Sequence, residues 1–330
     1  MTINCGIIGF GKMGQIRARA IADSGIGRVV AVYDINPEIT DAFPVLESPD
    51  AIIHHPDVEA VFIATPNFQI KPLVIQALNA GKHVFSEKPP GINAAEVREI
   101  RKAEAAAGDR KLMFGFNHRH HLSIRKMKDV IDSGDLGRVL WMRGRYGKEV
   151  DESFFSGWRA KKELSGGGIM LDQGIHMLDL FLYLGGDFDE VHAFVSNLFW
   201  HIEGVEDNVF AIFRSNQSGI CASLHSTMTQ WRYLFSLEIF LEKGALVLNG
   251  LKTSSGAYGD EDLAIKKNHD HPEEGRFESE ERITYHTDTS WESEINAFFS
   301  AIRDDSPINL GNSTDALKLM EILDKIYQNQ

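Results

Sequence analysis

The amino-acid sequence predicts an N-terminal α/β domain with a parallel sheet, followed by an α+β domain with a large, mostly antiparallel open sheet. Two observations support this fold class. In the first part of the chain, apolar runs of strand length alternate with stretches of helical period, the pattern of parallel strands joined by crossover helices. In the second part, longer alternating runs follow one another across short polar turns, as in an antiparallel sheet. We expect one domain over residues 1–120 and another over 121–330.

The elements of the first domain are expected in the order strand, helix, strand. The expected strands are Ile3–Ile8, Val29–Tyr33, Ala60–Ala64, His83–Phe85 and Leu112–Gly115. The expected helices are Met13–Ala22, Phe68–Ala80 and Ala94–Ala107. Gly25 and Gly81 each follow a helix and are expected to end it. Asn93, with Glu96 three residues later, is expected to begin the third helix through a capping box.

The second domain begins with an expected helix over His120–Asp132, and a sheet follows. Its expected strands are Val139–Tyr146, Glu190–Phe199, Asn208–Phe213, Ile220–Met228, Leu234–Leu241 and Ala245–Leu248. Further helices are expected at Gly174–Leu184, Trp291–Ile302 and Asp315–Tyr327. The stretch Lys252–Glu281 is charged and poor in large apolar residues, so we expect an exposed excursion there.

Composition restricts the class of protein. The formal net charge of −13 argues against a nucleic-acid binder, which needs a basic face. The two cysteines, Cys5 and Cys221, give neither a disulfide framework nor a zinc spacing, which fits a reducing, cytoplasmic location. No apolar run approaches the ~20 residues that span a bilayer, and we expect no membrane partner.

A glycine motif lies where the first strand meets the first helix. The strand Ile3–Ile8 runs into Gly9-Phe10-Gly11-Lys12-Met13-Gly14. In a dinucleotide-binding Rossmann domain, the first glycine permits a tight turn, the second admits the pyrophosphate, and the third lets the helix pack on the strand. The helix N-terminus then presents free N–H groups to the phosphates. The alternative is an ordinary strand-to-helix turn.

Asp34 ends the second expected strand, twenty residues past Gly14. A carboxylate there can accept hydrogen bonds from ribose hydroxyls and would repel a 2′-phosphate. Ile35, Asn36 and Pro37 follow, without the arginine or lysine that usually accommodates that phosphate. We therefore expect NAD rather than NADP as the cofactor. A merely solvated strand end is the alternative interpretation of Asp34.

Three further segments carry a family resemblance. They are Ala64-Thr65-Pro66-Asn67, Glu87-Lys88-Pro89 and the run from Ser165-Gly166-Gly167-Gly168 to Asp172-Gln173-Gly174-Ile175-His176. In this order, together with the glycine motif, they make the chain resemble the Gfo/Idh/MocA family, the glucose–fructose oxidoreductase and inositol dehydrogenase group, over nearly its whole length. One position departs from the pattern. The family often has a histidine three residues past the asparagine, where this chain has Ile70.

The same residues suit hydride transfer to or from a secondary alcohol. That reaction needs a base for the hydroxyl proton and a group that steadies the charge developing on oxygen. Asp172 and His176 are four residues apart, which on a helix puts them on one face. Lys88 follows a parallel strand, where open α/β sheets present ligands. Taken singly, a lysine after a strand is usually solvated, and a lone histidine on an apolar helix is more often a core residue.

The resemblance implies roles for a larger set of residues. His176 is implied to be the acid/base, Asp172 to hold the substrate or assist the histidine, and Lys88 to contact the reacting hydroxyl. The implied cofactor-binding residues are Gly9, Phe10, Gly11, Lys12, Met13, Gly14, Asp34, Ala64, Thr65, Pro66, Asn67, Glu87, Lys88, Trp158 and Arg159. The implied substrate-binding residues are Lys88, Asn117, Arg119, Lys162, Asp172 and His176.

A metal site is not expected. His118, His120 and His121 do not all point one way on a helix or an extended segment, and no acidic ligand set accompanies them. The function expected is hydride transfer between NAD and a hydroxyl-bearing carbon of a sugar, an inositol or a nucleotide-linked sugar. NAD-dependent glycoside cleavage with transient sugar oxidation and a non-catalytic NAD-binding sensor are the alternatives. Second domains of this kind commonly pack sheet to sheet, so we expect a homodimer or homotetramer.

Overall fold

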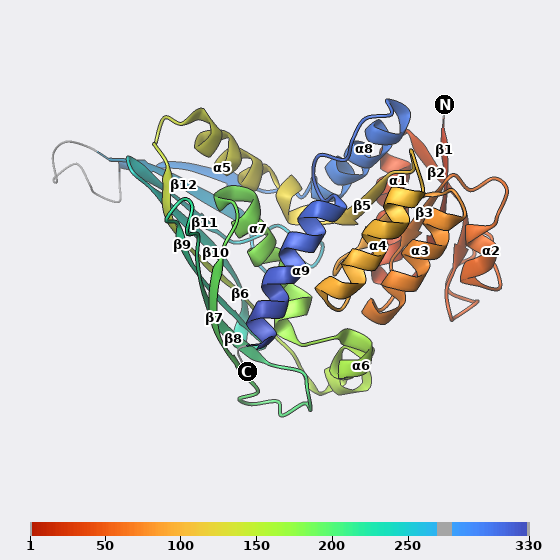
Figure 1. The fold of residues 1–330 in the computed structure, drawn as a ribbon, viewed down its shortest axis with the longest axis horizontal. Helices are drawn as coiled ribbons and strands as arrows, with labels where there is room; N and C mark the ends of the chain where they lie inside the picture. The colour runs from red at the N-terminus through yellow and green to blue at the C-terminus, as the bar shows by residue number, and fades with distance from the viewer. Residues whose placement is uncertain (1, 269–278, 329–330) are drawn as a thin grey trace. The chain divides into compact units, whose positions relative to one another are not determined.

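The computed structural model describes residues 2–268 and 279–328, which form two compact units. The first unit contains the chain up to Asn117 together with Glu163–Gly166 and Ser290–Glu321. The second contains His118–Lys162, Gly167–Thr289 and the chain from Ile322 on. Figure 1 follows the elements of both units along the chain. The predicted fold class is confirmed, with a parallel sheet first and a larger, mostly antiparallel sheet after it.

The first unit is built on a parallel sheet with the strand order β2-β1-β3-β4-β5. Its strands are β1 (Ile3–Ile8), β2 (Gly27–Tyr33), β3 (Ala60–Ile63), β4 (His83–Glu87) and β5 (Leu112–Gly115). Its helices include α1 (Lys12–Asp23), α2 (Pro49–Ile53), α3 (Ile70–Asn79), α4 (Ala94–Ala106) and α8 (Ser290–Arg303). The expected strands and long helices are confirmed, whereas the five-residue helix α2 is too short to have shown a helical period.

Local signals set the helix ends in this unit as the sequence indicated. Gly25 and Gly81 have φ angles of 64° and 74°, in the left-handed region that glycine adopts without strain. The Asn93 side chain accepts a hydrogen bond from the Glu96 backbone N–H at 3.0 Å. Glu96 in turn accepts one from the Ile92 N–H at 3.0 Å. The first bond satisfies an N–H group that the first turn of the helix leaves without an intrahelical partner, and the second ties the residue before the cap to the same turn.

The core of the first unit includes side chains from the C-terminal part of the chain. Phe62 and Phe85 stack with ring centroids 5.2 Å apart, and Phe298 of α8 lies edge-on to both. Residues 290–321 therefore lie with the first unit, although the sequence places them with the second domain. A helical apolar stripe indicates that a helix packs on a sheet, but it does not indicate which sheet.

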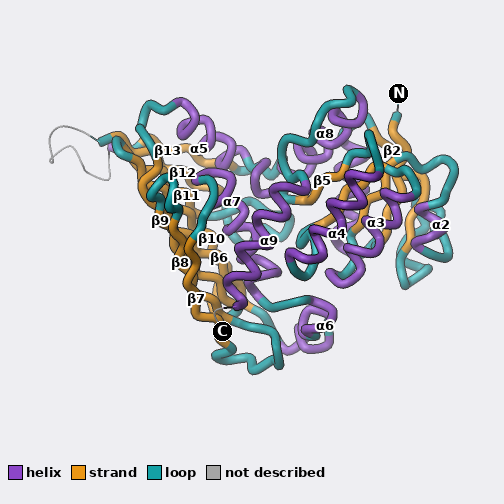
Figure 2. The backbone as a smooth tube through the Cα atoms, viewed as in Figure 1, coloured by secondary structure: helices purple, strands orange, loops and turns teal. Residues whose placement is uncertain are grey.

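The second unit is built on a sheet with the order β13-β12-β11-β10-β6-β9-β8-β7. Figure 2 draws its strands in orange. Its strands are β6 (Val139–Glu149), β7 (Glu190–Ser196), β8 (Asn208–Arg214), β9 (Cys221–Thr227), β10 (Thr229–Leu241), β11 (Gly244–Asn249), β12 (Glu261–Lys267) and β13 (Glu281–Tyr285). Neighbouring strands are antiparallel except for β6 and β9, which are parallel. The helix α5 (Leu122–Ser133) precedes the sheet, and α9 (Ser313–Gln328) ends the described chain.

The helix α7 (Ile175–Gly185) packs on β6 and β9 of this sheet. The helix packs closely because β6 has a glycine beneath it. A Cβ on Gly144 would lie 2.5 Å from the Met177 side chain and 2.9 Å from that of Phe181. The five residues before α7, Met170–Gly174, form a π-helical segment that carries Asp172. The close contact at Gly144 therefore fixes the height of α7, and of its histidine, above the sheet.

The stretch Lys252–Glu281 is expected to be an exposed excursion, and this expectation is wrong for Glu261–Lys267. The structure forms β12 there, and Leu263 and Ile265 on this strand are buried. These two residues alternate with charged or small ones, so the apolar content of the wider stretch stays low although one strand face is apolar. Residues 269–278 lie outside the described residues.

No helix in residues 2–268 and 279–328 is long and apolar enough to cross a bilayer.

Candidate active site

The glycine motif of the first unit forms a tight turn at the carboxyl end of β1. Gly9 has a φ of 89°, and a Cβ there would lie 2.6 Å from the Ala64 carbonyl oxygen. A Cβ on Gly14 would lie 2.1 Å from the Gly9 carbonyl oxygen. Gly11, the N-terminal cap residue of α1, has nothing within 4 Å of its Cβ position. Gly9 and Gly14 are thus required by the fold, whereas Gly11 keeps open the space in front of the helix.

Asp34 closes the turn from the side of β2. Its Oδ2 accepts a hydrogen bond from the Phe10 N–H at 2.7 Å, and its Oδ1 accepts one from the Asn36 N–H at 3.0 Å. A carboxylate oxygen has two lone pairs, so each oxygen can accept a further hydrogen bond. The carboxylate is therefore held beside the glycine turn while keeping capacity for hydroxyl donors.

The segment after β3 lies against the same turn. The Thr65 hydroxyl oxygen is buried and has no hydrogen-bond partner among the described residues. Asn67 is buried and donates a hydrogen bond from Nδ2 to the Ser165 carbonyl oxygen at 2.7 Å. Open space before Gly11, a buried hydroxyl oxygen beside the turn and a carboxylate on β2 are the features that a dinucleotide requires. The residues present therefore fit a bound NAD.

Glu87 ends β4, and Lys88 follows it directly. The Glu87 carboxylate accepts a hydrogen bond from Arg17 Nε of α1 at 2.6 Å, and the same guanidinium reaches Glu294 of α8 through Nη1 at 2.6 Å. Burial lowers the pKa of Arg17, but the two carboxylates outweigh that effect and raise it. The Glu87 side chain is thus engaged in the core of the unit, and its expected cofactor contact stays a prediction.

In the second unit, Asp172 lies between two cations. Lys148 Nζ, near the end of β6, lies 2.5 Å from Asp172 Oδ2, and Arg159 Nε lies 3.3 Å from Asp172 Oδ1. The Arg159 guanidinium also lies over the Trp158 ring, 4.4 Å from its centroid. Trp158 and Arg159 form part of a 3₁₀ turn, η4 (Trp158–Ala160). Sequence reasoning missed Lys148, because a lysine at a strand end resembles any solvated charge.

The glycine run before Asp172 is held by a buried carboxylate. Glu206 accepts hydrogen bonds from the Gly168 N–H at 2.7 Å and the Met170 N–H at 2.9 Å. The Tyr327 hydroxyl donates to the same carboxylate at 2.9 Å. A Cβ on Gly168 would lie 2.0 Å from the Glu206 carbonyl oxygen, so this position requires glycine. The run thereby fixes where the segment with Asp172 begins.

His176 is the second residue of α7 and is buried. Its ring stacks face to face on His118, with centroids 3.8 Å apart and an interplanar angle of 11°. His118 Nε2 lies 3.2 Å from the hydroxyl of Tyr146 on β6. Burial above all, then the neighbouring Tyr258 and the Asp172 charge, raise the pKa of Tyr146 well above its usual value. The His176 ring therefore lies near this phenol, at 6.4 Å between centroids, and Asp172 acts on the phenol through its charge. The sequence predicted the pair without the phenol.

Two further polar residues belong to these surroundings. Gln173 follows Asp172 in the chain, and Tyr258 contacts Tyr146. Gln173 Nε2 donates a hydrogen bond to the Tyr258 hydroxyl at 2.6 Å, and its Oε1 is buried without a partner among the described residues. The Tyr258 ring lies 5.2 Å from that of Tyr146, centroid to centroid. Tyr258 belongs to the stretch expected to be an exposed excursion, which is why the sequence did not indicate it.

The remaining expected substrate-binding residues have other contacts. Arg119 is buried in a bidentate ion pair with Asp179 of α7, at 2.9 and 2.6 Å. Asn117 donates a hydrogen bond from Nδ2 to Ser290 Oγ at 3.2 Å. The aliphatic stem of Lys162 covers Gly204, whose Cβ position lies 2.6 Å from Lys162 Cδ. Substrate contacts by these three residues stay predictions.

No group of three or more histidine, cysteine, aspartate or glutamate side chains in residues 2–268 and 279–328 could hold a metal ion. His121, one of the three neighbouring histidines, contacts Glu261 instead, with 2.6 Å between Nδ1 and Oε1.

Comparison with known families gives two matches that together cover most of the chain. Residues 3–116 match a model described as an oxidoreductase family with an NAD-binding Rossmann fold. Residues 124–247 match the model of the GFO/IDH/MocA C-terminal domain. The two matches lie in the order expected from the resemblance in the sequence and confirm it.

Similar proteins include sugar and polyol enzymes. The chain is 30% identical over 251 residues to 1,5-anhydro-D-fructose reductase of Ensifer adhaerens, covering 73% of this chain and 72% of that protein. It is 36% identical over 156 residues to inositol 2-dehydrogenase of Gluconacetobacter diazotrophicus, covering 44% of this chain and 46% of that one. Among solved structures, levoglucosan dehydrogenase in complex with NADH matches with a TM-score of 0.86 at 24% identity, covering 100% and 97% of the two chains.

Proposed function

The chain belongs to the GFO/IDH/MocA family and is an oxidoreductase of the kind that acts on CH–OH groups, and from this premise we propose that it transfers hydride between NAD and a carbon of a sugar, an inositol or a nucleotide-linked sugar. The observation that carries the proposal is the arrangement around Tyr146. Asp172 influences this phenol through its charge, and the His176 ring lies 6.4 Å from it, centroid to centroid. The proposed acid/base and an anion thus both act near one buried phenol.

The proposed division of labour follows the domain boundaries expected from the sequence. Residues 1–120 would hold the dinucleotide and residues 121–330, apart from Glu163–Gly166 and Ser290–Glu321, the substrate. When bound, NAD supplies the hydride acceptor or donor. Gly9–Gly14, the segment Ala64–Asn67 and Asp34 would hold it, with contacts from Lys88, Trp158 and Arg159. The ribose hydroxyls would use the second lone pairs of Asp34, and a 2′-phosphate would meet its negative charge, so we propose NAD rather than NADP.

The proposed chemistry uses three side chains. His176 accepts the hydroxyl proton as the alcohol is oxidised and returns it in the reverse direction. Asp172, which pairs with Lys148 and Arg159, accepts a hydrogen bond from the substrate and holds it in position for the reaction. Lys88 steadies the charge that develops on the reacting oxygen. The buried Gln173 Oε1, without a partner among the described residues, suits a second hydroxyl and so favours a polyhydroxylated substrate.

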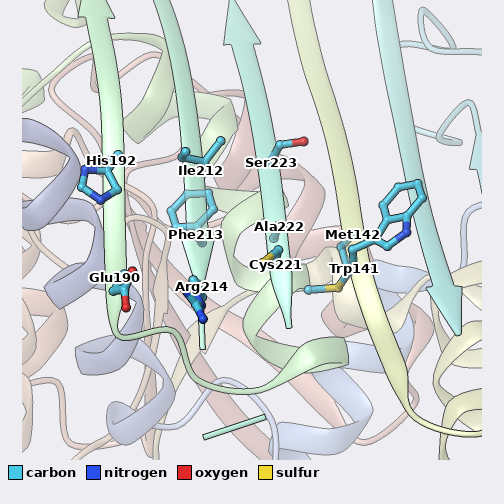
Figure 3. A pocket seen from close by; sticks show the side chains of 10 residues that line it. All are labelled: Trp141, Met142, Glu190, His192, Ile212, Phe213, Arg214, Cys221, Ala222 and Ser223. Carbon is cyan, nitrogen blue, oxygen red and sulfur yellow. The ribbon is translucent and has the colours of Figure 1, made fainter. Parts of the chain in front are cut away.

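The outward face of the second sheet supports a homo-oligomer. Phe194 is 80% exposed, Ile212 57% and Phe210 51%, on the adjacent strands β7 and β8. Figure 3 shows the neighbouring part of this face, where side chains of β6, β7, β8 and β9 line a hollow of about 370 Å³. Arg143 and Glu238 pair on the same face, so it carries both signs of charge beside the apolar patch. Such a mixture is complementary to itself, and we propose a second copy of this chain as its partner.

A screen of NAD reduction tests the proposed function. The panel contains sugars, inositols, sugar phosphates and nucleotide sugars, offered to the wild type and to Lys88→Ala and His176→Ala. On the best substrate we expect each substitution to lower kcat/KM by at least about 100-fold. Lys102→Ala and His54→Ala, at exposed positions of α4 and the end of α2, are the matched controls. Full activity of both site variants would refute the assigned roles. Binding of NAD without turnover of any compound would favour a sensor.

The cytoplasmic location stays a prediction. It depends on the cysteines, of which Cys5 is buried and Cys221 exposed, both as free thiols.

A further inference from the structure

We propose that His118 is a positioning residue for His176, whose ring it orients by stacking and with which it binds a single proton. This inference rests on the proposed function of His176 as the acid/base. The rings are nearly parallel at 3.8 Å, and the two residues are only 4% and 6% exposed. The sequence suggests His118 only as a candidate metal ligand, and the proposed hydride transfer gives His118 no role.

An ion pair next to the ring stack joins the same two segments that carry His118 and His176. Next to His118 in the chain, Arg119 forms the buried bidentate ion pair with Asp179. Asp179 lies three residues past His176 on α7, which is about one helical turn. The ion pair and the ring stack therefore join the same two segments, η2 (Asn117–His120) and α7, at two neighbouring points. Because a bidentate pair has a fixed geometry, it holds the imidazoles face to face.

The far edges of the His118 ring are also occupied. Tyr146 lies 3.2 Å from His118 Nε2 through its hydroxyl, and Phe235 of β10 lies 6.2 Å away, ring to ring. His121 meets His118 edge-on at 5.5 Å between centroids. Besides His176, these three rings therefore lie within 6.2 Å of the His118 ring, centroid to centroid. An imidazole fixed in this way fixes the plane of the one stacked on it, and with it the direction of the nitrogen that exchanges protons.

The charges around the pair limit how many protons it can bind. Burial disfavours a charged imidazole, and a second positive charge at 3.8 Å disfavours it further. The titratable and charged groups around the pair, in contact with it or with its neighbours, include Tyr146 and Lys148 on β6, Arg119 and His121 near η2, Asp172 and Asp179 around α7, Arg159 of η4, Tyr258, and Glu261 on β12.

Each anion of this set has a charged or titratable partner. Asp172 pairs with Lys148 and Arg159, Asp179 with Arg119, and Glu261 with His121. Burial raises the pKa of Glu261, but the hydrogen bond and charge of His121 outweigh this and lower it. Because the rings lie only 3.8 Å apart, a proton on one imidazole disfavours a second positive charge on the other, so the pair binds its second proton at a lower pH than its first. Their two titration steps then belong to the pair and not to either ring.

Two substitutions separate orientation from charge. His118→Ala removes the stack, and His118→Phe keeps a flat ring without a titratable nitrogen. We expect His118→Ala to lower kcat by about 10-fold or more with KM changed by less than about threefold, because a displaced acid/base affects the chemical step. We expect His118→Phe to restore kcat to within about threefold of the wild type. His54→Phe, at an exposed position, is the matched control.

The binding of a single proton by the His118–His176 pair is tested on the enzyme without substrate or NAD. The histidine ring signals are followed in an NMR titration. His118→Phe and His176→Ala identify the two signals. In the wild type we expect both rings to respond to two steps separated by more than about one pH unit, and in His118→Phe a single step. Independent titration of the rings, or wild-type kcat in His118→Ala, would overturn the inference. Full activity of His176→Ala would instead overturn the proposed function, whatever the titration shows.

Discussion

The Nε of Arg17 lies 2.6 Å from the Glu87 carboxylate in the core of the first unit. This contact joins α1, the helix that begins at the glycine turn, to the strand end from which Lys88 follows. Arg17 is fully buried, with its guanidinium 4.4 Å from the centroid of Phe85 and a second carboxylate, Glu294, at 2.6 Å. A structural ion pair thus couples two segments that we propose to bind the cofactor.

Replacing Arg17 by methionine is expected to destabilise the protein by about 3–5 kcal/mol, because it leaves two buried carboxylates without their cation. Urea unfolding of the two proteins measures the difference. Arg98→Met is the matched control, since Arg98 lies equally close to Glu321, at 2.7 Å, with both side chains largely exposed. We expect that variant to lose less than about 1 kcal/mol. Equal losses in the two variants would contradict the structural role of Arg17.

Gly11→Ala is expected to weaken NAD binding without affecting folding. Its Cβ would meet nothing within 4 Å in the protein, but would occupy the space before the α1 N-terminus. We expect a melting temperature within about 2 °C of the wild type and a dissociation constant for NAD at least about 10-fold higher. Gly14→Ala is the contrast, because its Cβ would lie 2.1 Å from the Gly9 carbonyl oxygen, and it should lower the melting temperature. Unchanged NAD affinity in Gly11→Ala, measured by calorimetry, would argue against a pyrophosphate at this turn.

Asp34→Ala is expected to lower kcat/KM for NAD by about 10- to 100-fold, the effect of losing hydrogen bonds to a charged acceptor. The preference over NADP should shrink, since the repelling charge is removed. Asp34→Asn keeps one acceptor oxygen for the Phe10 N–H and should fall between the two proteins. Steady-state kinetics with both cofactors give the comparison. A wild type that prefers NADP would overturn our assignment of the cofactor.

His83 is expected to contribute to acid sensitivity. Burial, together with the charges of Arg110 and Lys111, lowers its pKa to about 4, and its Nδ1 accepts the Lys111 N–H at 3.0 Å. The unfolded chain takes up this proton near the ordinary pKa of about 6.5. Between these values the unfolded state binds more protons, so the free energy of unfolding falls as the pH falls from about 6.5 to about 4. His83→Gln should flatten this part of the curve, measured by urea unfolding at several pH values. An equally steep decline in the variant would exclude His83 as a cause.

Lysine in place of Phe210 is expected to separate the proposed oligomer into monomers, because it puts a charge into a half-exposed apolar patch. Light scattering after size exclusion gives the mass of each species. Leu122→Lys, at a partly exposed apolar residue of α5, should leave the assembly unchanged. A wild type that is monomeric at micromolar concentration would contradict the proposed interface.

Local sequence patterns predicted much of the fold and part of the site. The apolar runs of the first unit, the Asn93 cap and the glycine turn depend on residues close together in the chain, so period and spacing reveal them. Asp172 and His176 were identified through a family motif. The π-helical segment that carries Asp172 departs from the ordinary helical turn that their spacing of four residues suggested.

The partners of these side chains could not be predicted in the same way. Lys148 lies 24 residues from Asp172, His118 lies on a separate segment from His176, and Tyr258 belongs to a charged stretch. Nothing local in the sequence distinguishes these residues from solvated ones, because their surroundings arise only when the sheet and α7 come together. The same holds for α8, whose apolar stripe fits the first unit although it follows the second in sequence.

The most direct test of hydride transfer uses the best alcohol from the screen, deuterated at the reacting carbon. The enzyme is incubated with this alcohol and NAD, and the mass of the NADH formed is measured. Direct transfer to NAD predicts NADH heavier by one deuterium. Glycoside cleavage without net NADH, or NADH that carries no label, would contradict the central claim that this protein oxidises an alcohol by passing its hydride to NAD.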